Sequence, residues 1–417
     1  MAILALICTS VNAQDMNPSN NGNTPYSRYG YGRLAETSFV RNRGMGGIGY
    51  GLRSNLQTNP MNPASYTAID SLTFLFDFGV NGQLVNYKEN GARQNKWNGG
   101  LDYLAMQFPL SKHLAASIGL LPYSYVGYGY GAVDSTATTD TSDERIRYIK
   151  QYAGNGGLNK VYVGLGGKPF KWVSLGVNVG YIFGEISNDF SVTFPDNNGT
   201  ATYSYQTVSA RALELQFGVQ FMHTFNVKHA VTLGATFSPK MNMWADASYI
   251  QTTTASDTTK TNNVLSIPQT LGIGASYVYD NRLTIGADVK MEKWGDVAGL
   301  NDQLEKKDNL FRNTTKIAVG AEYLPSLSSR SYLSRMRYRA GMHYSDSYIE
   351  VKDSRNKELG FTLGLGFPLK NQKSMVNVAF EYIDVRPQNK SFLSENYLQL
   401  NIGLTFNEFW FFKNKLK

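Results

Sequence analysis

The chain has 417 residues and a mean hydropathy of −0.31, with 27 tyrosines, 22 phenylalanines and 40 glycines against 13 prolines. This composition excludes a helical membrane protein, because no run beyond the N-terminus approaches the roughly 18 apolar residues that a spanning helix needs. The formal charge of +8 is scattered, without the basic patch and interleaved aromatics of a nucleic-acid site, so no nucleic-acid partner is expected. A β-barrel membrane protein remains possible, because its strands alternate polar and apolar faces.

Residues 1–13, "MAILALICTSVNA", indicate a secretory signal peptide, in which an apolar run ends at small residues before Gln14. No Lys or Arg precedes the apolar run, so the true start codon stays open. The single cysteine, Cys8, lies inside this segment. The processed chain is therefore expected to have neither a thiol nor a disulfide.

Residues 14–70 show no strand alternation. Within them, "RGMGGIGYGL" holds Gly44, Gly46 and Gly49 at the G-x-G-x-x-G spacing of dinucleotide sites. That motif needs a buried strand before it and a helix after it, whereas Pro60 and Pro63 would break a following helix. No cofactor is expected. The glycines instead indicate close backbone packing, or positive φ angles, in a confined space.

From residue 71 onward, apolar and polar residues alternate in segments of about ten, the pattern of strands with one face in lipid. The apolar faces begin near residues 72, 104, 114, 161, 173, 213, 231, 271, 283, 317, 336, 361, 376 and 398. Short turns alternate with longer linkers, at 124–156, 239–263 and 292–312, so both chain ends fall on the periplasmic side. The sequence predicts an all-β fold, a 14-stranded antiparallel transmembrane β-barrel at residues 71–412 in a Gram-negative outer membrane, with a basic tail at 413–417.

Glycines recur on the polar, inward-facing phase of these strands and would leave room in the lumen. They are Gly164, Gly166, Gly176, Gly180, Gly234, Gly272, Gly274, Gly286, Gly320, Gly364, Gly366 and Gly403. Because glycine weakens a strand by roughly 0.5–1 kcal/mol, such a lining indicates an occupant. Residues 14–70 are predicted to be that occupant, an N-terminal luminal hatch.

The segment "SRMRYRAGMHY" places Arg335, Arg337 and Arg339 on the luminal phase, with Met336 on the lipid phase. The same wall offers luminal carboxylates at Asp77, Glu214, Asp288, Glu322 and Glu381. One interpretation is an internal ion-pair network that holds the hatch. The other is ligand binding, in which an unpaired arginine receives an anionic head group such as a fatty-acid carboxylate.

A hatch followed by fourteen strands resembles the FadL family of outer-membrane transporters for hydrophobic compounds. "RGMGGIGYGL" resembles the start of that family's hatch, and Asn62-Pro63-Ala64 resembles the Asn-Pro-Ala signature that ends it. The resemblance implies passive uptake of hydrophobic or amphipathic molecules into an apolar luminal pocket, with lateral release beside the third strand. It also covers PorV-like barrels, plugged subunits that dock in a secretion machine, and the fold does not choose between the two.

The third strand contains Pro122, followed by Gly127 and Gly129. Proline cannot donate to a strand ladder, so a lateral gate is expected beside Pro122, opposed or opened by Asn62, Pro63 and Ala64 of the hatch. The alternative is that Pro122 ends the strand as it leaves the membrane and that "YSYVGYGYG" forms an interfacial tyrosine girdle.

The four histidines, His113, His223, His229 and His343, match no metal-ligand spacing, and no G-x-S-x-G motif occurs. Neither catalytic residues nor a metal site is therefore expected, and the protein is not predicted to be an enzyme. The expected partners are outer-membrane lipid and lipopolysaccharide, a hydrophobic ligand such as a fatty acid, the barrel-assembly machinery, and other outer-membrane proteins.

Overall fold

The computed structural model describes residues 24–409, apart from residues 90, 138–144, 197, 198, 254, 298–309, 327 and 372. The expected signal peptide at residues 1–13 and the basic tail at 413–417 lie outside the described residues. No helix in the described part of the chain is long and apolar enough to cross a membrane.

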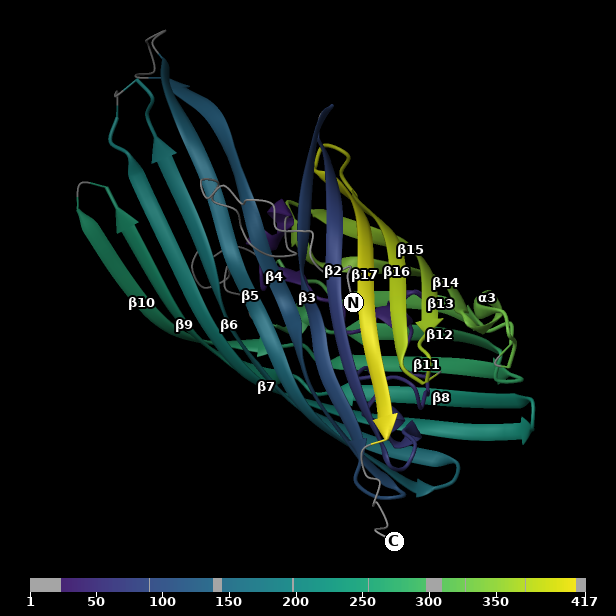
Figure 1. Cartoon of the computed structure of the whole chain (residues 1–417). Coiled ribbons are helices and arrows are strands. Elements are labelled where there is room, and N and C mark those ends of the chain that lie inside the picture. The colour runs from purple at the N-terminus through teal and green to yellow at the C-terminus, as the bar shows by residue number, and fades with distance from the viewer. Residues whose placement is uncertain are drawn as a thin grey trace.

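The wall is an antiparallel sheet that closes on itself, because the last strand pairs with the first one of the wall (Figure 1). Its strands are β2 (Thr73–Glu89), β3 (Ala92–Pro109), β4 (Leu114–Ala137), β5 (Arg145–Phe170), β6 (Val173–Thr193), β7 (Thr202–Asn226), β8 (His229–Ser238), β9 (Met241–Thr252), β10 (Ser256–Ile267), β11 (Thr270–Tyr279), β12 (Leu283–Glu292), β13 (Thr314–Tyr323), β14 (Arg337–Val351), β15 (Ser354–Pro368), β16 (Met375–Pro387) and β17 (Ser394–Phe409).

Two pairs of these strands each form one interrupted strand of the wall. β8 and β9 both pair with β7, while β11 pairs with β8 and β10 pairs with β9. Counted in this way, the described wall has fourteen strands. The predicted 14-stranded antiparallel barrel is confirmed.

The outer surface of the barrel is apolar. Side chains of the predicted lipid face are exposed, as at Leu363 (64 %), Ile273 (51 %) and Phe217 (48 %). Exposed apolar side chains over a closed sheet are the property of a barrel surrounded by lipid. Met336 is an exception to the predicted face, because it caps the short helix α3 (Tyr332–Arg335) and is buried.

The barrel is much taller on one side than on the other. Strands β11, β12 and β13 have 10 residues each, enough to cross a bilayer. β4 and β5 have 24 and 26 residues and, with β6, β7, β9 and β10, rise together as one sheet (Figure 1). Much of the predicted linkers 124–156 and 239–263 is therefore strand, and the expectation of loops there was wrong.

The remaining described elements are short. They are η1 (Pro25–Arg28), β1 (Arg33–Leu34), α1 (Val40–Arg43), η2 (Pro63–Ala68), η3 (Trp294–Asp296) and α3. Residues 24–72, called the luminal segment below, carry the first four of these elements. This segment lies inside the barrel.

Between Gly44 and Ala64 the luminal segment follows the inner circumference of the wall and meets an inward-facing glycine on one strand after another. In the order of the strands around the wall, from β15 to β5, these are Gly364, Gly341, Gly320, Gly286, Gly274, Gly234, Gly218, Gly176 and Gly166. A Cβ atom on Gly364 would lie 2.9 Å from the Cα atom of Gly44, and one on Gly166 would lie 2.8 Å from the Pro63 carbonyl oxygen. These glycines, called the glycine track below, let the luminal segment lie directly against the wall, backbone against backbone at most of the positions.

The luminal segment needs glycine for a second reason at Gly46 and Gly47. Their φ angles are +72° and +83°, a conformation that other residues rarely adopt. The turn brings the Gly46 amide to the Thr362 hydroxyl oxygen at 2.8 Å. The G-x-G-x-x-G stretch therefore makes a turn against the wall.

A Gly320→Ala substitution is expected to weaken the seat of the luminal segment, because the new Cβ would collide with the Met45 backbone. Overpacking of this kind costs typically about 1–3 kcal/mol. The temperature at which the folded band converts to the unfolded band in gel electrophoresis should fall. Gly129→Ala is the matched control, since no atom lies within 4 Å of its added Cβ, and an equal loss in both variants would contradict the seating role.

Candidate functional site

Glu322 on β13 is the buried centre of an ion-pair cluster between the wall and the luminal segment. Arg41 of the luminal segment donates two hydrogen bonds to its carboxylate, at 3.0 and 3.1 Å. Arg339 and Arg337 on β14 donate to the same carboxylate at 2.7 and 2.8 Å. The Glu322 side chain is only 3 % exposed. Three cations on one buried acid hold α1 against β13 and β14.

The three arginines predicted as ligand-binding residues therefore have different positions. Arg337 and Arg339 are luminal and already paired with Glu322. Arg335 belongs to helix α3 and lies over the Tyr332 ring at 5.6 Å, because β14 begins only at Arg337. The predicted row of three luminal arginines is thus a row of two, and ligand binding by any of them stays a prediction.

Arg43 forms a second buried connection, to Asp102 on β3. Its guanidinium lies 2.7 Å from the Asp102 carboxylate and also donates to the Asn401 amide oxygen and the Ser38 carbonyl oxygen, both at 3.0 Å. Both members of the ion pair are almost completely buried. Removing one partner of such a pair would leave an uncompensated charge inside the barrel.

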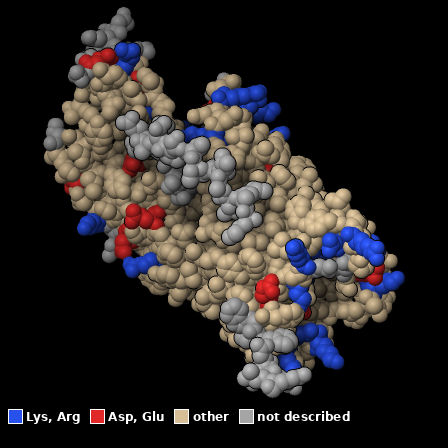
Figure 2. Space-filling model, in the orientation of Figure 1, with Lys and Arg blue, Asp and Glu red and all other residues tan. Residues whose placement is uncertain are grey.

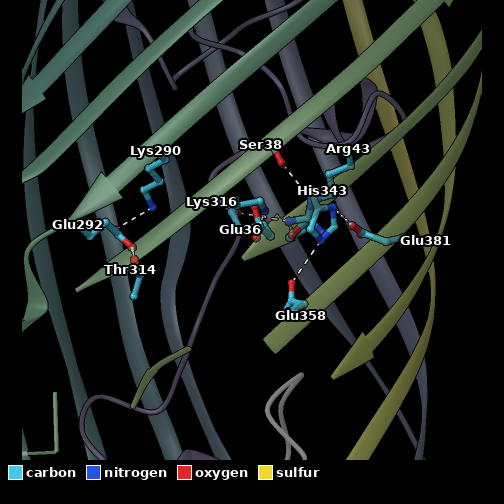
Figure 3. A network of polar contacts seen from close by, with 11 residues as sticks. Glu36, Ser38, Arg43, Lys290, Glu292, Thr314, Lys316, His343, Glu358 and Glu381 are labelled. Carbon is cyan, nitrogen blue, oxygen red and sulfur yellow. Dashed lines mark hydrogen bonds and ion pairs between the residues drawn. The ribbon is translucent and has the colours of Figure 1, made fainter. Parts of the chain in front are cut away.

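Figure 3 shows a third group, in which the luminal segment contacts β13 to β16. The Glu36 carboxylate lies 2.5 Å from the Lys316 ammonium. His343, which is 2 % exposed, lies 3.3 Å from Glu358 and 3.7 Å from Glu381. Burial acts to raise the pKa of Glu36, but Lys316 and His343 outweigh it and hold that pKa below its usual range. The Glu36 carboxylate is therefore charged.

A cavity of about 220 Å³ lies beside these groups. Charged side chains line much of it, among them Arg33, Glu36, Lys290, Lys316, Glu358 and Glu395, with Ile383, Val385 and Tyr397 also lining it. The resemblance implied an apolar pocket, and the lining of this cavity is apolar only in part. Its lining combines apolar surface with fixed charges of both signs, which suits an amphipathic molecule.

The wall has an open seam between β3 and β4. These strands pair only where Leu104–Pro109 lies beside Ala115–Leu120. Toward the outside, β3 pairs with β2 alone as far as Ala92, and β4 keeps its pairing with β5 as far as Ala137. Within the described part of the chain, no strand pairs with the free side of β3 above Leu104.

A bulge in each strand marks the start of the seam. Asp102 is an extra residue in β3, since Leu101 and Tyr103 pair with the adjacent residues Val80 and Gly79. Tyr123 is the corresponding extra residue of β4, directly after Pro122. A bulge bends its strand and increases the local twist, which accounts for the separation of the two strands.

The luminal segment holds both sides of this seam. Its strand β1 pairs with the free edge of β4, where Arg33 lies opposite Tyr125 and Leu34 opposite Ser124. Arg43 binds Asp102 at the bulge on β3. A second cavity, of about 80 Å³, is lined by Pro122 and by residues 34, 35 and 37, which also line the first cavity.

The predicted gate residues lie in two places. Pro122 is at the start of the seam, and its strand continues to Ala137, so the alternative that Pro122 ends the strand was wrong. Asn62 caps η2, accepts from the Ala64 amide at 3.1 Å and donates to the Tyr50 carbonyl oxygen at 2.8 Å. With Pro63 it lies near β6 and β7. A gating role for these four residues stays a prediction.

Sequence reasoning missed Arg41, Arg43 and Asp102. One available signal was the spacing of Leu101 and Leu104, which are both on the outer face although they are three residues apart. Period-2 alternation cannot place both outside without a bulge between them. Charges on a segment predicted to fill a lumen, as in "ETSFVRNR", were a second signal.

A closed wall of fourteen strands with an apolar exterior defines a β-barrel of the Gram-negative outer membrane. Solved structures with this fold include the Pseudomonas putida toluene transporter TodX, at 14 % identity and a TM-score of 0.56 over 91 % of this chain and 100 % of that one. A Pseudomonas aeruginosa FadL homologue has 14 % identity and a TM-score of 0.59, over 91 % of this chain and 98 % of that one. The Ralstonia pickettii toluene transporter TbuX has 14 % identity and a TM-score of 0.56, over 90 % of this chain and 99 % of that one.

No curated sequence relative matches the chain. The family model described as BamG matches residues 1–417. The chain therefore belongs to the BamG family, and its fold is that of FadL-type barrels.

A Glu322→Gln substitution is expected to loosen the luminal segment, because Arg41, Arg337 and Arg339 would lose their shared carboxylate. Breaking a buried charge cluster from one side costs roughly 3–5 kcal/mol. Thermal conversion of the folded band measures the loss. Asp246→Gln removes a carboxylate from an exposed pair with Arg211 and should cost at most about 1 kcal/mol; a similar loss in both variants would contradict a special role for Glu322.

Proposed function

We propose that the protein takes up amphipathic small molecules passively and releases them sideways into the outer membrane through the seam between β3 and β4, with residues 14–70 acting as a hatch. The observation that carries this proposal is the loss of pairing between the two strands above Leu104 and Leu120. The neighbours TodX and TbuX, named as toluene transporters, support transport of compounds with apolar parts.

Two features of the seam support an exit for lipophilic molecules. Its lower end lies beside Leu101, an exposed apolar residue of the outer face, so the gap begins within the apolar band. Pro122 brings no backbone N–H to the free edge of β4. A molecule leaving here would gain roughly 0.8 kcal/mol for each CH₂ that it buries in lipid, without an energy source.

The lining of the larger cavity favours an amphipathic ligand over a pure hydrocarbon. Arg33 lies at the seam, since its backbone pairs with β4, and it lines the larger cavity. Its guanidinium lies 4.0 Å from the centre of the Tyr397 ring and donates to the Gln83 side chain at 3.4 Å. Among the described residues no carboxylate is within ion-pair distance of Arg33, so a fatty-acid carboxylate would add a charged partner.

A reversible lock tests the proposal. Leu34 and Ser124 are register partners of β1 and β4, a geometry in which two cysteines can bridge. Under oxidising conditions, Leu34→Cys/Ser124→Cys should fix the luminal segment to β4 and reduce uptake of a fluorescent fatty acid to the level of a deletion strain. A reductant should restore uptake.

The matched control for this lock lies below the seam. Leu104→Cys/Leu120→Cys joins register partners of β3 and β4 where these strands already pair, so oxidation should leave uptake unchanged. If the locked and reduced forms of the Leu34/Ser124 variant transport equally well, lateral release past β1 is wrong.

A second function, as a docking subunit of an outer-membrane assembly or secretion machine, is favoured by the closure of the lumen. Below the cavity, buried ion pairs and the glycine track hold the luminal segment. On the outer side, Tyr31, Trp294, Phe311 and Tyr348 form a buried aromatic cluster with ring centroids 4.5–5.9 Å apart. The tall sheet of β4 to β7 would offer the docking surface.

The docking function makes a different prediction for the same locked variant. Purification from native membranes in mild detergent should yield an outer-membrane protein in fixed ratio with the chain, and oxidation of the Leu34/Ser124 pair should leave that ratio unchanged. Mass spectrometry of the complex measures it. A chain that purifies alone, and whose lock abolishes uptake, would contradict docking and favour transport.

A further inference from the structure

The outer face of the β2–β3 hairpin carries three successive pairs of side chains. The register pairs Leu84 with Trp97, Asn86 with Asn95, and Lys88 with Arg93. Because successive side chains of a strand alternate, all six point to the same side of the sheet. That side is the lipid side, since Trp97 is 68 % exposed and Leu84 is 37 % exposed on it.

Lys88 and Arg93 are two cations directly opposite each other. Like charges in this position destabilise a strand pair. Lys88 and Arg93 are exposed, and among the described residues neither forms an ion pair with a carboxylate. Glu89, the next residue of β2, points to the other side of the sheet by alternation. Figure 2 shows Lys and Arg side chains gathered at the tip of this hairpin.

The height of this pair matches the head-group region of the outer leaflet. On β2 the apolar outer side chains run from Phe76 to Leu84, which pair with Phe406 and Leu398 of β17. Eight residues at about 3.4 Å each give about 27 Å along the strand, and a tilt of about 40° reduces this to a height of about 21 Å, within the apolar band of about 25 Å in such barrels. Lys88 is four residues higher, and Trp97 is at the boundary that tryptophan prefers.

We propose that Lys88 and Arg93 form a binding site for a phosphorylated head group of an outer-leaflet lipid, of the kind carried by lipid A. The cations would contact the phosphate, Asn86 and Asn95 the sugar, and Trp97 and Leu84 the upper part of the acyl chains. The ligand supplies the negative charge that the Lys88–Arg93 pair lacks. This site faces away from the lumen and does not depend on the proposed function.

The test measures binding of lipid A to the full-length protein in phosphatidylcholine nanodiscs, by native mass spectrometry over a range of lipid A concentrations. The variant is Lys88→Gln/Arg93→Gln. Its matched control is Lys171→Gln/Lys228→Gln, which removes the same charge from two exposed lysines in the turns at the opposite end of the barrel. The hairpin variant should bind lipid A about tenfold more weakly, and the control should bind within twofold of the unsubstituted protein.

Two further ligands distinguish a lipid phosphate from free phosphate at this site. Phosphatidylglycerol should bind at the same site, more weakly than lipid A, and lose affinity in the same variant. Inorganic phosphate at millimolar concentration should not displace lipid A; efficient displacement would show a free-phosphate site and overturn the lipid assignment. Equal affinity of the hairpin variant and the control would overturn the site itself.

Measurements of thermal stability distinguish a ligand-binding role of Lys88 and Arg93 from a structural role. In neutral detergent without lipid A, Lys88→Gln/Arg93→Gln should be at least as heat-resistant as the unsubstituted protein, because the repulsion is gone. Added lipid A should raise the melting temperature of the unsubstituted protein but not that of the variant. A variant that is destabilised without lipid would assign the pair a structural role and contradict the proposal.

Discussion

The contact between the backbone of the luminal segment and the backbone of the wall is the constraint on which the other features depend. It requires glycine on both partners, as at Gly44 and Gly364, whose backbones nearly touch. Each glycine costs a strand roughly 0.5–1 kcal/mol, and the lost stability is offset by burial of residues such as Met45 and Ile48, both fully buried. A side chain on the glycine track would lift the luminal segment away from the wall and separate its ion pairs.

Ion pairs then determine the position of the luminal segment along the glycine track. The segment brings the cations Arg41 and Arg43, and the wall supplies the acids Glu322 and Asp102 at matching positions. A shift by one residue would leave buried charges unpaired, at a cost of several kcal/mol for each. The glycines allow the luminal segment to lie against the wall but do not select its position along the track, whereas the ion pairs select that position. Together they leave the luminal segment one seated position.

The sequence predicts those parts of the fold where lipid contact forces a pattern. All fourteen membrane-crossing strands are predictable because each presents apolar side chains, such as Ile273 or Phe217, at every second position. The outer parts of β4 and β5, and much of β9 and β10, were taken for loops because both faces of a strand above the membrane are free from contact with lipid. The outward positions there, for example Gln151 and Asn155, therefore need not be apolar. Arg335 was misplaced because β14 starts after a short helix, which period-2 alternation cannot distinguish from strand.

The candidate site was less predictable because it depends on contacts between distant parts of the chain. Asp77, Asp288 and Glu322 were predicted as luminal acids, but nothing in the sequence pairs Glu322 with Arg41 or Asp102 with Arg43 across the barrel.

The two parts of the luminal segment make different contacts with the wall. Residues 33–43 hold both edges of the seam, while residues 44–64 follow the glycine track. Under the proposed lateral release, a local change in the first part would open the wall sideways, while the second part would stay seated and keep the lumen closed to ions.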